Sequence, residues 1–501
     1  MVKDPRITMS PNIIAQYLEK DPEEFTKEDL IKFIEGNEIR MVNFRFVGED
    51  GRLKTINFII NSKAHLDQLL SAGERVDGSS LFSYIDPTSS DLYVIPRYKT
   101  AYLNPFSSIP AIDMLCSYYT SDGSRLPSSP DNIARKAHKA LKSSTGLNLE
   151  AMGELEYYVF SDRQHHYPNM SQEGYGESSP FSKWERLRCE AMQAIAQAGG
   201  KVKYAHSEVG SICGEDHDME QHEIEFLPVP LEDAADQVVI ARWVLRMIGY
   251  KYGVTLSFAP KILVGQAGNG LHIHTKLVKN GTNVMVEENQ LSDLAKKMIA
   301  GYLHLASSLT AFGNTVPISY LRLVPHQEAP TLVCWGDRNR NVLVRVPLGW
   351  IGAKNMAGDA NPQDEGDELE FNGRQTVEFR CPDGSADIYL LLAGLAVAAR
   401  YGLEREASRD EAEKLYVDVN TFLSETGNNQ DGLTKLPASC WESAECLLKD
   451  REIYQRDGVF PEAVINGIVK RLKSFNDKGL SDELSGKEDE LIKLVDKYLH
   501  C

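Results

Sequence analysis

The sequence predicts an α+β protein in which a small N-terminal domain, residues 1–120, precedes a much larger α/β domain, residues 121–501. The first 120 residues combine short helical patterns with strands in which apolar and polar residues alternate. From about residue 130, long helical patterns alternate with short strands, as in a domain built on a helix-covered sheet. The length of 501 residues is ample for two domains of these sizes.

The N-terminal domain is predicted to begin with helices and to continue with a hairpin. Thr26 precedes Lys27–Asp29 and a run of apolar residues, which is the pattern of an N-capped amphipathic helix. Apolar and polar residues alternate over 42–46 and again over 56–60. Because Gly51 lies between the two segments, they are predicted to pair as a β-hairpin.

The large domain is predicted to contain long helices, short strands and one extended surface segment. The helices are expected at 231–252, 291–312 and 386–407. The strands are expected at 154–160, 222–226, 271–277, 342–346 and 376–381. The tract 357–373 is acidic and rich in Gly, Asn and Asp, which predicts an exposed loop or mobile flap.

Composition and charge argue against several classes of protein. The chain is 42% hydrophobic and 25% charged, which is ordinary for a globular protein. Its net charge of −18 argues against nonspecific binding to nucleic acid or to anionic membranes. No segment approaches the roughly 18 to 20 apolar residues of a membrane span, and no signal peptide is evident. Eight cysteines without a Cys-x-x-Cys pair predict free thiols and a cytoplasmic protein.

Ionisable residues recur at every second position of several predicted strands. The pairs are Glu154 and Glu156, Glu223 and Glu225, His272 and His274, and Glu378 and Arg380. Because residues i and i+2 of a strand face the same side, these pairs predict a sheet with one polar face. Carboxylates with an occasional imidazole suit Mg²⁺ or Mn²⁺, and the lack of thiolates counts against zinc. A solvated strand face would account for any single pair.

Arginines form a second group of candidate functional residues, which comprises Arg322, Arg338, Arg340 and Arg345. Arginines beside divalent cations neutralise charge on a transferring phosphoryl group, although a surface ion-pair network would explain any one of them. The sequence has no G-x-x-x-x-G-K-[ST] motif, so an ordinary P-loop is not the nucleotide site. The glycine-rich stretch 265–270 fits a turn as well as a ligand-binding loop.

Seven short blocks, in order along the chain, resemble glutamine synthetase of the bacterial type I class over about residues 35–475. They are 76–80 (VDGSS), 153–157 (GELEY), 207–209 (SEV), 268–274 (GNGLHIH), 322–330 (RLVPHQEAP), 338–340 (RNR) and 378–383 (EFRCPD). The resemblance implies a β-grasp-like N-terminal domain and a catalytic domain with a curved antiparallel sheet lined by ionisable residues. It also implies formation of glutamine from glutamate, ammonium and ATP through a γ-glutamyl phosphate.

The resemblance further implies a role for each matching residue. Two or more divalent cations, Mg²⁺ or Mn²⁺, would be held in two groups. The first group is Glu156, Glu208 and Glu223, and the second is Glu154, His272 and Glu378. His274, Arg340 and Arg345 would bind the ATP phosphates, with both arginines also catalytic. Arg322, Arg380, Gly268 and Ser80 would bind the amino-acid or ammonium substrate.

Two further catalytic residues are implied, together with an assembly. Glu328 would lie on a flap that excludes water from the acyl phosphate. Asp77 would take a proton from ammonium, and its domain would complete the active site of a neighbouring subunit. The expected assembly is therefore a homo-oligomer of two stacked six-membered rings.

Several positions depart from the family pattern and leave the acceptor open. Ala267 stands where an Asn is usual, His326-Gln327 replaces Gly-Tyr, and Thr376 replaces an Arg near the nucleotide. The segment between Glu208 and Glu223 is also longer than usual. Ala267 and the neighbourhood of Gln327 favour, as a second hypothesis, a γ-glutamyl ligase that uses an organic amine or polyamine in place of ammonia. A non-catalytic homologue is the third hypothesis, and it predicts losses among the metal ligands and arginines that the sequence does not have.

Overall fold

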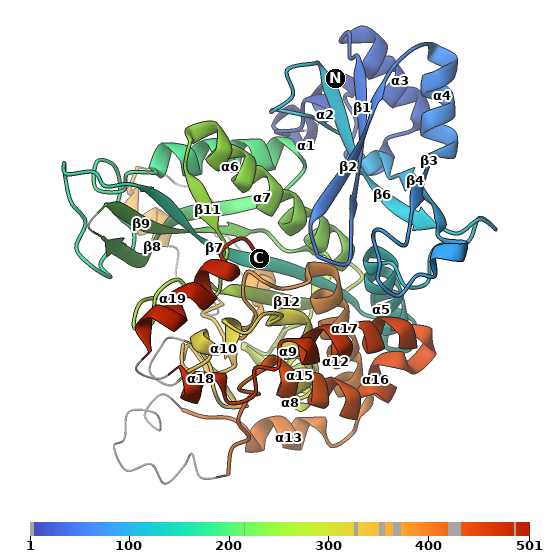
Figure 1. Ribbon diagram of the computed structural model, residues 1–501. Coiled ribbons are helices and arrows are strands. Elements are labelled where there is room, and N and C mark those ends of the chain that lie inside the picture. Colours follow the sequence, from blue (N-terminus) through green and yellow to red (C-terminus); the bar gives the residue numbers. More distant parts are fainter. Residues whose placement is uncertain are drawn as a thin grey trace.

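The chain folds around two β-sheets that lie side by side, as the computed structural model in Figure 1 shows. The model describes residues 5–214, 216–324, 329–349, 356–363, 372–418, 432–484 and 487–501. The first sheet uses strands from residues 41–119, and the second uses strands from residues 148–379. Helices pack against both sheets, so the predicted α+β class is confirmed.

The N-terminal sheet has the strand order β2-β1-β6-β4-β3, with β5 paired to β6. Its strands are β1 (Met41–Val47), β2 (Leu53–Ile59), β3 (Glu74–Asp77), β4 (Asp91–Pro96), β5 (Tyr102–Leu103) and β6 (Ala111–Tyr119). Helices α2 (Ile13–Leu18), α3 (Lys27–Gly36) and α4 (Lys63–Ala72) contribute leucines and isoleucines to its apolar core. The predicted capping box is present, because the Thr26 side chain accepts from the Asp29 amide and Asp29 accepts from the Thr26 amide.

The predicted hairpin is confirmed, but its first strand is buried on both faces. Strands β1 and β2 pair antiparallel from Met41 opposite Ile59 to Val47 opposite Leu53. The polar alternation in β1 predicts one exposed face, yet Asn43 and Arg45 are buried. Their face packs against the large domain, where the Arg45 guanidinium lies 4.4 Å from the ring centroid of Trp243.

The large sheet has the strand order β16-β17-β18-β12-β7-β9-β8. Its main strands are β7 (Asn148–Asp162), β8 (Val202–Cys213), β9 (His217–Phe226), β12 (Leu271–Lys279), β16 (Trp335–Asp337), β17 (Val344–Val346) and β18 (Val377–Phe379). Each neighbouring pair is antiparallel except β16 and β17. The predicted strands are therefore all present. Strand β7 extends beyond the predicted 154–160 at both ends, and β9 begins at His217 rather than at the predicted residue 222.

Helices cover one face of this sheet and leave its other face polar. Helix α7 (Leu231–Tyr252), which coincides with the predicted helix 231–252, packs on β7, where Gly153 lies close to Val238. The other large-domain helices include α5 (Pro130–Thr145), α8 (Asp293–His304), α9 (Ala306–Gly313) and α12 (Ile388–Glu404). The predicted helix 291–312 is divided at Leu305 into α8 and α9. Its apolar pattern continues through the division, so sequence periodicity did not reveal it.

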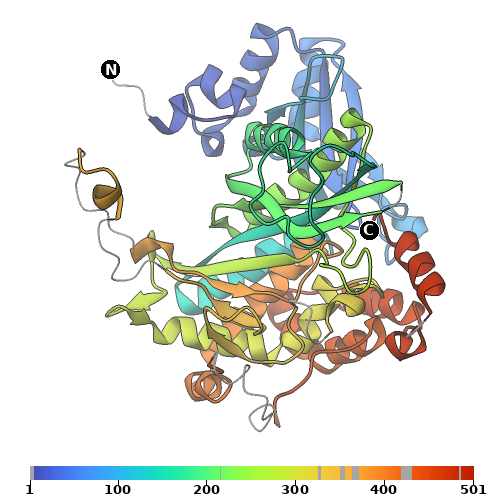
Figure 2. The same ribbon diagram turned by 90° about the vertical axis from the view of Figure 1, so that its left-hand side faces the viewer.

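The end of the described chain packs against the large domain (Figure 2). Helix α19 (Glu488–Lys497) places Leu491, Leu494 and Val495 against Tyr158 and Ile318. The predicted loop at 357–373 is partly helical, since α11 spans Met356–Ala360, and residues 364–371 of it lie outside the described residues. None of the described helices is long and apolar enough to cross a membrane. All eight cysteines are free thiols.

Candidate active site

Strand register brings the predicted carboxylates and histidines together on the polar face of the large sheet. In the pairing of β7 with β9, Glu156 lies opposite Glu223 and Glu154 lies opposite Glu225. On the other side of β7, Glu154 lies opposite His272 of β12. Because alternate residues of a strand share a face, residue 153 and its odd-numbered neighbours face α7 instead.

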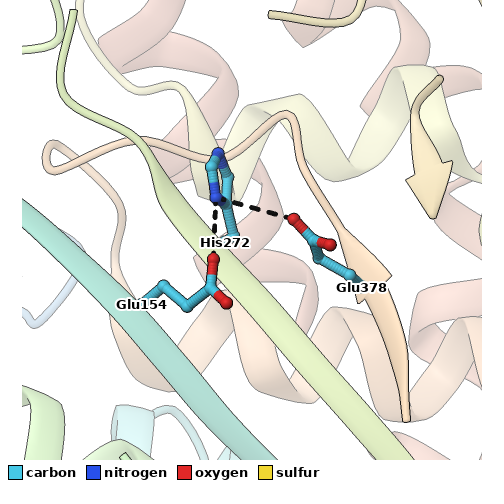
Figure 3. A group of neighbouring side chains, drawn as sticks. All are labelled: Glu154, His272 and Glu378. Carbon is cyan, nitrogen blue, oxygen red and sulfur yellow. Dashed lines mark hydrogen bonds and ion pairs between the residues drawn. The ribbon is translucent and has the colours of Figure 1, made fainter. Parts of the chain in front are cut away.

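Glu154, His272 and Glu378 form a compact group from three neighbouring strands (Figure 3). The Nδ1 atom of His272 lies 3.0 Å from a Glu154 oxygen and 3.6 Å from a Glu378 oxygen. One ligand atom from each residue lies within 4.8 Å of the other two, which is close enough to share one metal ion. These are the three residues predicted from the resemblance for the second cation.

Glu156 and Glu223 form a second group, again with one ligand atom each within 4.8 Å and with His272 as the third member. The sequence predicted Glu208 in this position. Glu208 lies nearby on β8, where its carboxylate accepts from the Val209 amide at 2.9 Å and lines the same pocket as Glu156. The resemblance implies a group of three carboxylates, Glu156, Glu208 and Glu223. In the structure the compact group is Glu156, Glu223 and His272, and Glu208 lies beside it.

Burial and mutual repulsion of these carboxylates indicate a cation-binding site. Burial, followed by the neighbouring Glu208, raises the pKa of Glu156 to about 7. Burial and the charges of Glu154 and Glu156 raise the pKa of Glu223 well above its ordinary value. A divalent cation between them would remove this repulsion, and oxygen ligands with one imidazole fit Mg²⁺ or Mn²⁺. The residues present therefore fit the metals that the resemblance implies.

The two histidines on β12 have pKa values shifted in opposite directions, because their neighbours differ. Burial, followed by the charge of Arg380, lowers the pKa of His272 to about 4, so its imidazole is neutral and able to bind a metal. Although burial acts in the opposite direction, Glu154 raises the pKa of His274, whose Nε2 lies 2.8 Å from a Glu154 oxygen. The Nδ1 atom of His274 lies 2.9 Å from the hydroxyl of Thr376, which orients the ring.

Three of the predicted arginines converge on this face. Arg345 and Arg380 both form ion pairs with Glu378, and the Arg345 contact measures 2.8 Å. Arg322, in α10 (Ser319–Arg322), is buried and donates to the carbonyl oxygen of Cys381 at 3.0 Å. The Nε atoms of Arg345 and Arg380 are buried without a hydrogen-bond partner. These arginines therefore retain unused donors for an anionic ligand.

A pocket of about 270 Å³ opens beside the second carboxylate group. Its lining includes Glu156, Glu208, Gly268, Arg322 and Arg380. A side chain at residue 268 would collide with the carbonyl of Pro260, so only glycine allows this close approach of the main chain. The pocket is thus lined by two arginines and two glutamates.

Other predicted residues lie apart from this centre. Asp77 and Ser80 belong to the N-terminal sheet, where Asp77 is exposed and accepts from the Ser79 and Ser80 hydroxyls. Hydrogen bonds from Ser80 and Ser79 hold the pKa of Asp77 well below its ordinary value. None of the hydrogen bonds and ion pairs of the described residues joins Asp77 to the carboxylates of the large sheet. Arg340 is exposed in the turn between β16 and β17, and Glu328 lies outside the described residues.

The structure adds residues that the sequence did not assign to the site. Gln221 donates to Glu156 at 3.1 Å and to the Gly268 carbonyl at 3.0 Å, so it connects β7 to the main chain before β12 within the pocket lining. His206 and Glu225 form a third group of possible ligand atoms with Glu223. Signals for all three were present in the sequence: Glu225 is two residues from Glu223, His206 is two residues from Glu208, and Gln221 stands in the Gln-x-Glu motif that contains Glu223.

Comparisons with known proteins agree with this fold and site. Residues 38–121 match the model of the glutamine synthetase β-grasp domain, and residues 127–480 match that of the glutamine synthetase catalytic domain. A glutamine synthetase of Clostridium saccharobutylicum is 28% identical over 441 residues, which cover 86% of this chain and 91% of the relative. The chain therefore belongs to the glutamine synthetase family, an ATP-dependent ligase family that uses divalent metal.

Two solved structures share the fold. The cryo-electron-microscopy structure of Plasmodium falciparum glutamine synthetase has a TM-score of 0.74 at 19% identity, covering 91% of this chain and 97% of that one. A complex of GmaS with ADP has a TM-score of 0.71 at 18% identity, covering 90% of this chain and 96% of that one. These likenesses support the β-grasp domain and the large catalytic domain.

Proposed function

We propose that this protein is a type I glutamate–ammonia ligase, which forms glutamine through a γ-glutamyl phosphate at the expense of ATP. The observation that carries the proposal is the pair of adjacent metal-ligand groups, Glu154–His272–Glu378 and Glu156–Glu223–His272. Two divalent cations, Mg²⁺ or Mn²⁺, would hold the ATP phosphates and neutralise their charge. A non-catalytic homologue would have no reason to keep these groups and their arginines.

The chain's own residues would bind and orient the reactants. Arg345 and His274 border the Glu154–His272–Glu378 group and would bind the transferring phosphate, joined by Arg340. Arg322, Arg380 and the main chain at Gly268 would hold the glutamate carboxylates in the 270 Å³ pocket. Glu156, Glu208 and Glu223 would hold the first cation beside this pocket. Glu328 would close over the intermediate and exclude water.

Asp77 would act from a neighbouring subunit, because it lies exposed in the N-terminal sheet of its own chain. Its depressed pKa keeps the carboxylate ionised, so it would attract ammonium, with Ser80 beside it. We propose that Asp77 also takes the proton that ammonium releases. This arrangement requires a homo-oligomer, for which we propose two stacked six-membered rings. We also propose a cytoplasmic location.

A second candidate is a γ-glutamyl ligase that uses an organic amine or polyamine. The observation that favours it is Ala267, whose amide donates to Gln172 and whose carbonyl accepts from Tyr158. Its methyl side chain offers no hydrogen bond to an amino-acid substrate, and neutral Gln172 and Gln266 line the same pocket. Such a lining would admit a larger and less polar acceptor than ammonium.

The test is phosphate release from ATP with Mg²⁺ and glutamate, with and without ammonium, methylamine, ethanolamine, putrescine or spermidine. Ammonium-dependent release with glutamine as product supports the first candidate, and activity with one amine alone supports the second. Glu378→Gln should lower the rate at least about 100-fold, because Glu378 pairs with both arginines and the histidine. Glu150→Gln is the control, since Glu150 lies on β7 of the same sheet but pairs with Lys276 instead. Absence of phosphate release with every acceptor, from a folded protein that binds Mn²⁺, would reject both candidates.

A further inference from the structure

Glu208, one of the residues expected to hold the first cation, lies where the pairing of β8 with β9 becomes irregular. The register pairs Ser207 with His222 and, beyond the irregularity, Ser211 with Glu220. Three residues of β8, beginning with Glu208, therefore lie opposite a single residue of β9. A bulge of this kind bends a strand and re-aims its side chains. The position of Glu208 thus depends on what fixes the two strands at the bulge.

Arg188 of helix α6 (Glu185–Gln197) holds both strands at this point. Its Nη1 atom donates to the Ser207 hydroxyl at 2.9 Å and to Nδ1 of His222 at 2.8 Å. The histidine nitrogen must be the acceptor, because a guanidinium has only donors. All three side chains are buried, so solvent does not compete for these bonds. One guanidinium therefore joins β8 to β9 at the bulge.

Further contacts tie this junction to the segment that precedes α6. The Ser207 hydroxyl donates to the Ser182 hydroxyl at 2.8 Å, and Ser182 donates to a Glu220 oxygen at 2.7 Å. The Nε2 atom of His222 lies 3.0 Å from the same Glu220 oxygen. The Gly176 amide donates to the Ser207 carbonyl at 2.9 Å. Ser207 is thus fixed through both its side chain and its main chain.

The two residues that Arg188 holds are the immediate neighbours of candidate metal ligands. Ser207 precedes Glu208, and His222 precedes Glu223. Because neighbours in a strand point to opposite faces, a contact that fixes one residue from the helix side sets the place of the next on the polar side. Carboxylates that share a site repel one another, so the backbone must hold them close for a cation to bind tightly.

We propose that Arg188 is a positioning residue for the first cation, on which it acts through Ser207 and His222 rather than by contact. This inference rests on the cation sites of the proposed function, but not on the identity of the acceptor. Among the described residues, no hydrogen bond or ion pair joins Arg188 to the Glu154–His272–Glu378 group. The second cation should therefore not depend on Arg188.

The test is calorimetric titration of the full-length protein with Mn²⁺, without substrates, in two backgrounds that each lose a ligand of one site. In the Glu378→Gln background, which impairs the second site, Arg188→Gln should weaken the remaining Mn²⁺ at least ten-fold. In the Glu223→Gln background, which impairs the first site, the same substitution should change the remaining Mn²⁺ less than two-fold. A residue that only stabilises the fold would affect both sites alike.

Two control variants separate positioning from stability. Arg186→Gln, at an exposed position of the same helix, should change neither Mn²⁺ affinity nor the Tm. Arg45→Gln breaks a buried ion pair with Asp113 in the N-terminal sheet, so it should lower the Tm without changing Mn²⁺ affinity. If Arg188→Gln does not fold, Ser207→Ala, which removes only the hydroxyl, should weaken the first Mn²⁺ at least three-fold in the Glu378→Gln background.

An unchanged affinity at the first site, or an equal loss at both sites, would overturn the role of Arg188. Because Mn²⁺ binding is measured without substrates, this outcome is distinct from that of the phosphate-release assay, which tests the proposed function. A wild-type protein that binds no Mn²⁺ would overturn both.

Discussion

The two sheets each bury carboxylates, and the neighbours of those carboxylates differ. In the N-terminal sheet, Asp113 of β6 is surrounded by donors, since it accepts from Asn43 at 2.7 Å, Arg45 at 2.6 Å and Asn104 at 3.0 Å. In the large sheet, Glu223 of β9 is surrounded mainly by other carboxylates, and the His206 imidazole lies 3.0 Å from one of its oxygens.

This difference separates a structural carboxylate from a ligand. A buried charge whose partners are all present stabilises one arrangement of the chain, because every acceptor is already used. A buried charge whose neighbours are also acceptors destabilises the protein until a cation arrives. Burial alone would not distinguish them, because Asp113 and Glu223 are both buried.

The largest effect on stability is expected at Asp113. Asp113→Asn keeps the shape of the side chain but leaves buried Arg45 without its carboxylate, so the free energy of unfolding should fall by about 3–5 kcal/mol. Denaturant titration measures this change. Asp91→Asn, which breaks an exposed pair with Arg75 in the same sheet, should cost less than about 1 kcal/mol. Similar losses for the two variants would contradict the structural role of Asp113.

Glu223→Gln should have the opposite effect on stability. Removing one of the crowded carboxylates should raise the Tm of the metal-free protein, because the repulsion with Glu154 and Glu156 is lost. Affinity for Mn²⁺ should fall at least about 100-fold, since a ligand is removed. Calorimetric titration with Mn²⁺ and thermal unfolding measure the two changes. A lower Tm in the metal-free variant would place Glu223 with Asp113 as a structural residue.

Asp387 is an intermediate case, because it is buried and has one main-chain donor. It caps α12 by accepting from the Leu390 amide at 3.2 Å, yet burial raises its pKa to about 6. The folded protein therefore binds this proton more tightly than the unfolded chain, and the stabilisation is lost as pH rises from about 4 to about 6.

Asp387→Asn keeps an N-cap acceptor and carries no charge. Relative to wild type, its free energy of unfolding should rise by about 1–3 kcal/mol between pH 4 and pH 7. Parallel denaturant titrations across this range measure the difference, and a constant difference would show that Asp387 is ionised throughout.

The shared face of the carboxylates could be predicted from the sequence, but the contacts that depend on the tertiary fold could not. The i, i+2 spacing of Glu154 and Glu156 gave the polar face because strand geometry is local. Burial of Arg45 depends on a contact with Trp243 that is almost 200 residues away, so local alternation predicted an exposed face instead. Gln172 reaches the Ala267 amide from a long irregular segment with no strand or helix pattern. Contacts of this kind are set by the tertiary fold.

The smallest effect is expected at Glu225, which shares a strand face with Glu223 but was not among the predicted metal ligands. Both lie on the same face of β9, but Glu225 accepts from Lys203 at 2.8 Å and from the Tyr204 hydroxyl. These donors already satisfy its charge, so Glu225→Gln should change Mn²⁺ affinity less than ten-fold and leave the metal-free Tm unraised. Because the two substitutions are identical and two residues apart, their comparison isolates the effect of the neighbours. A loss of Mn²⁺ affinity as large as that of Glu223→Gln would show that Glu225 is a metal ligand and that its contact with Lys203 does not satisfy its charge.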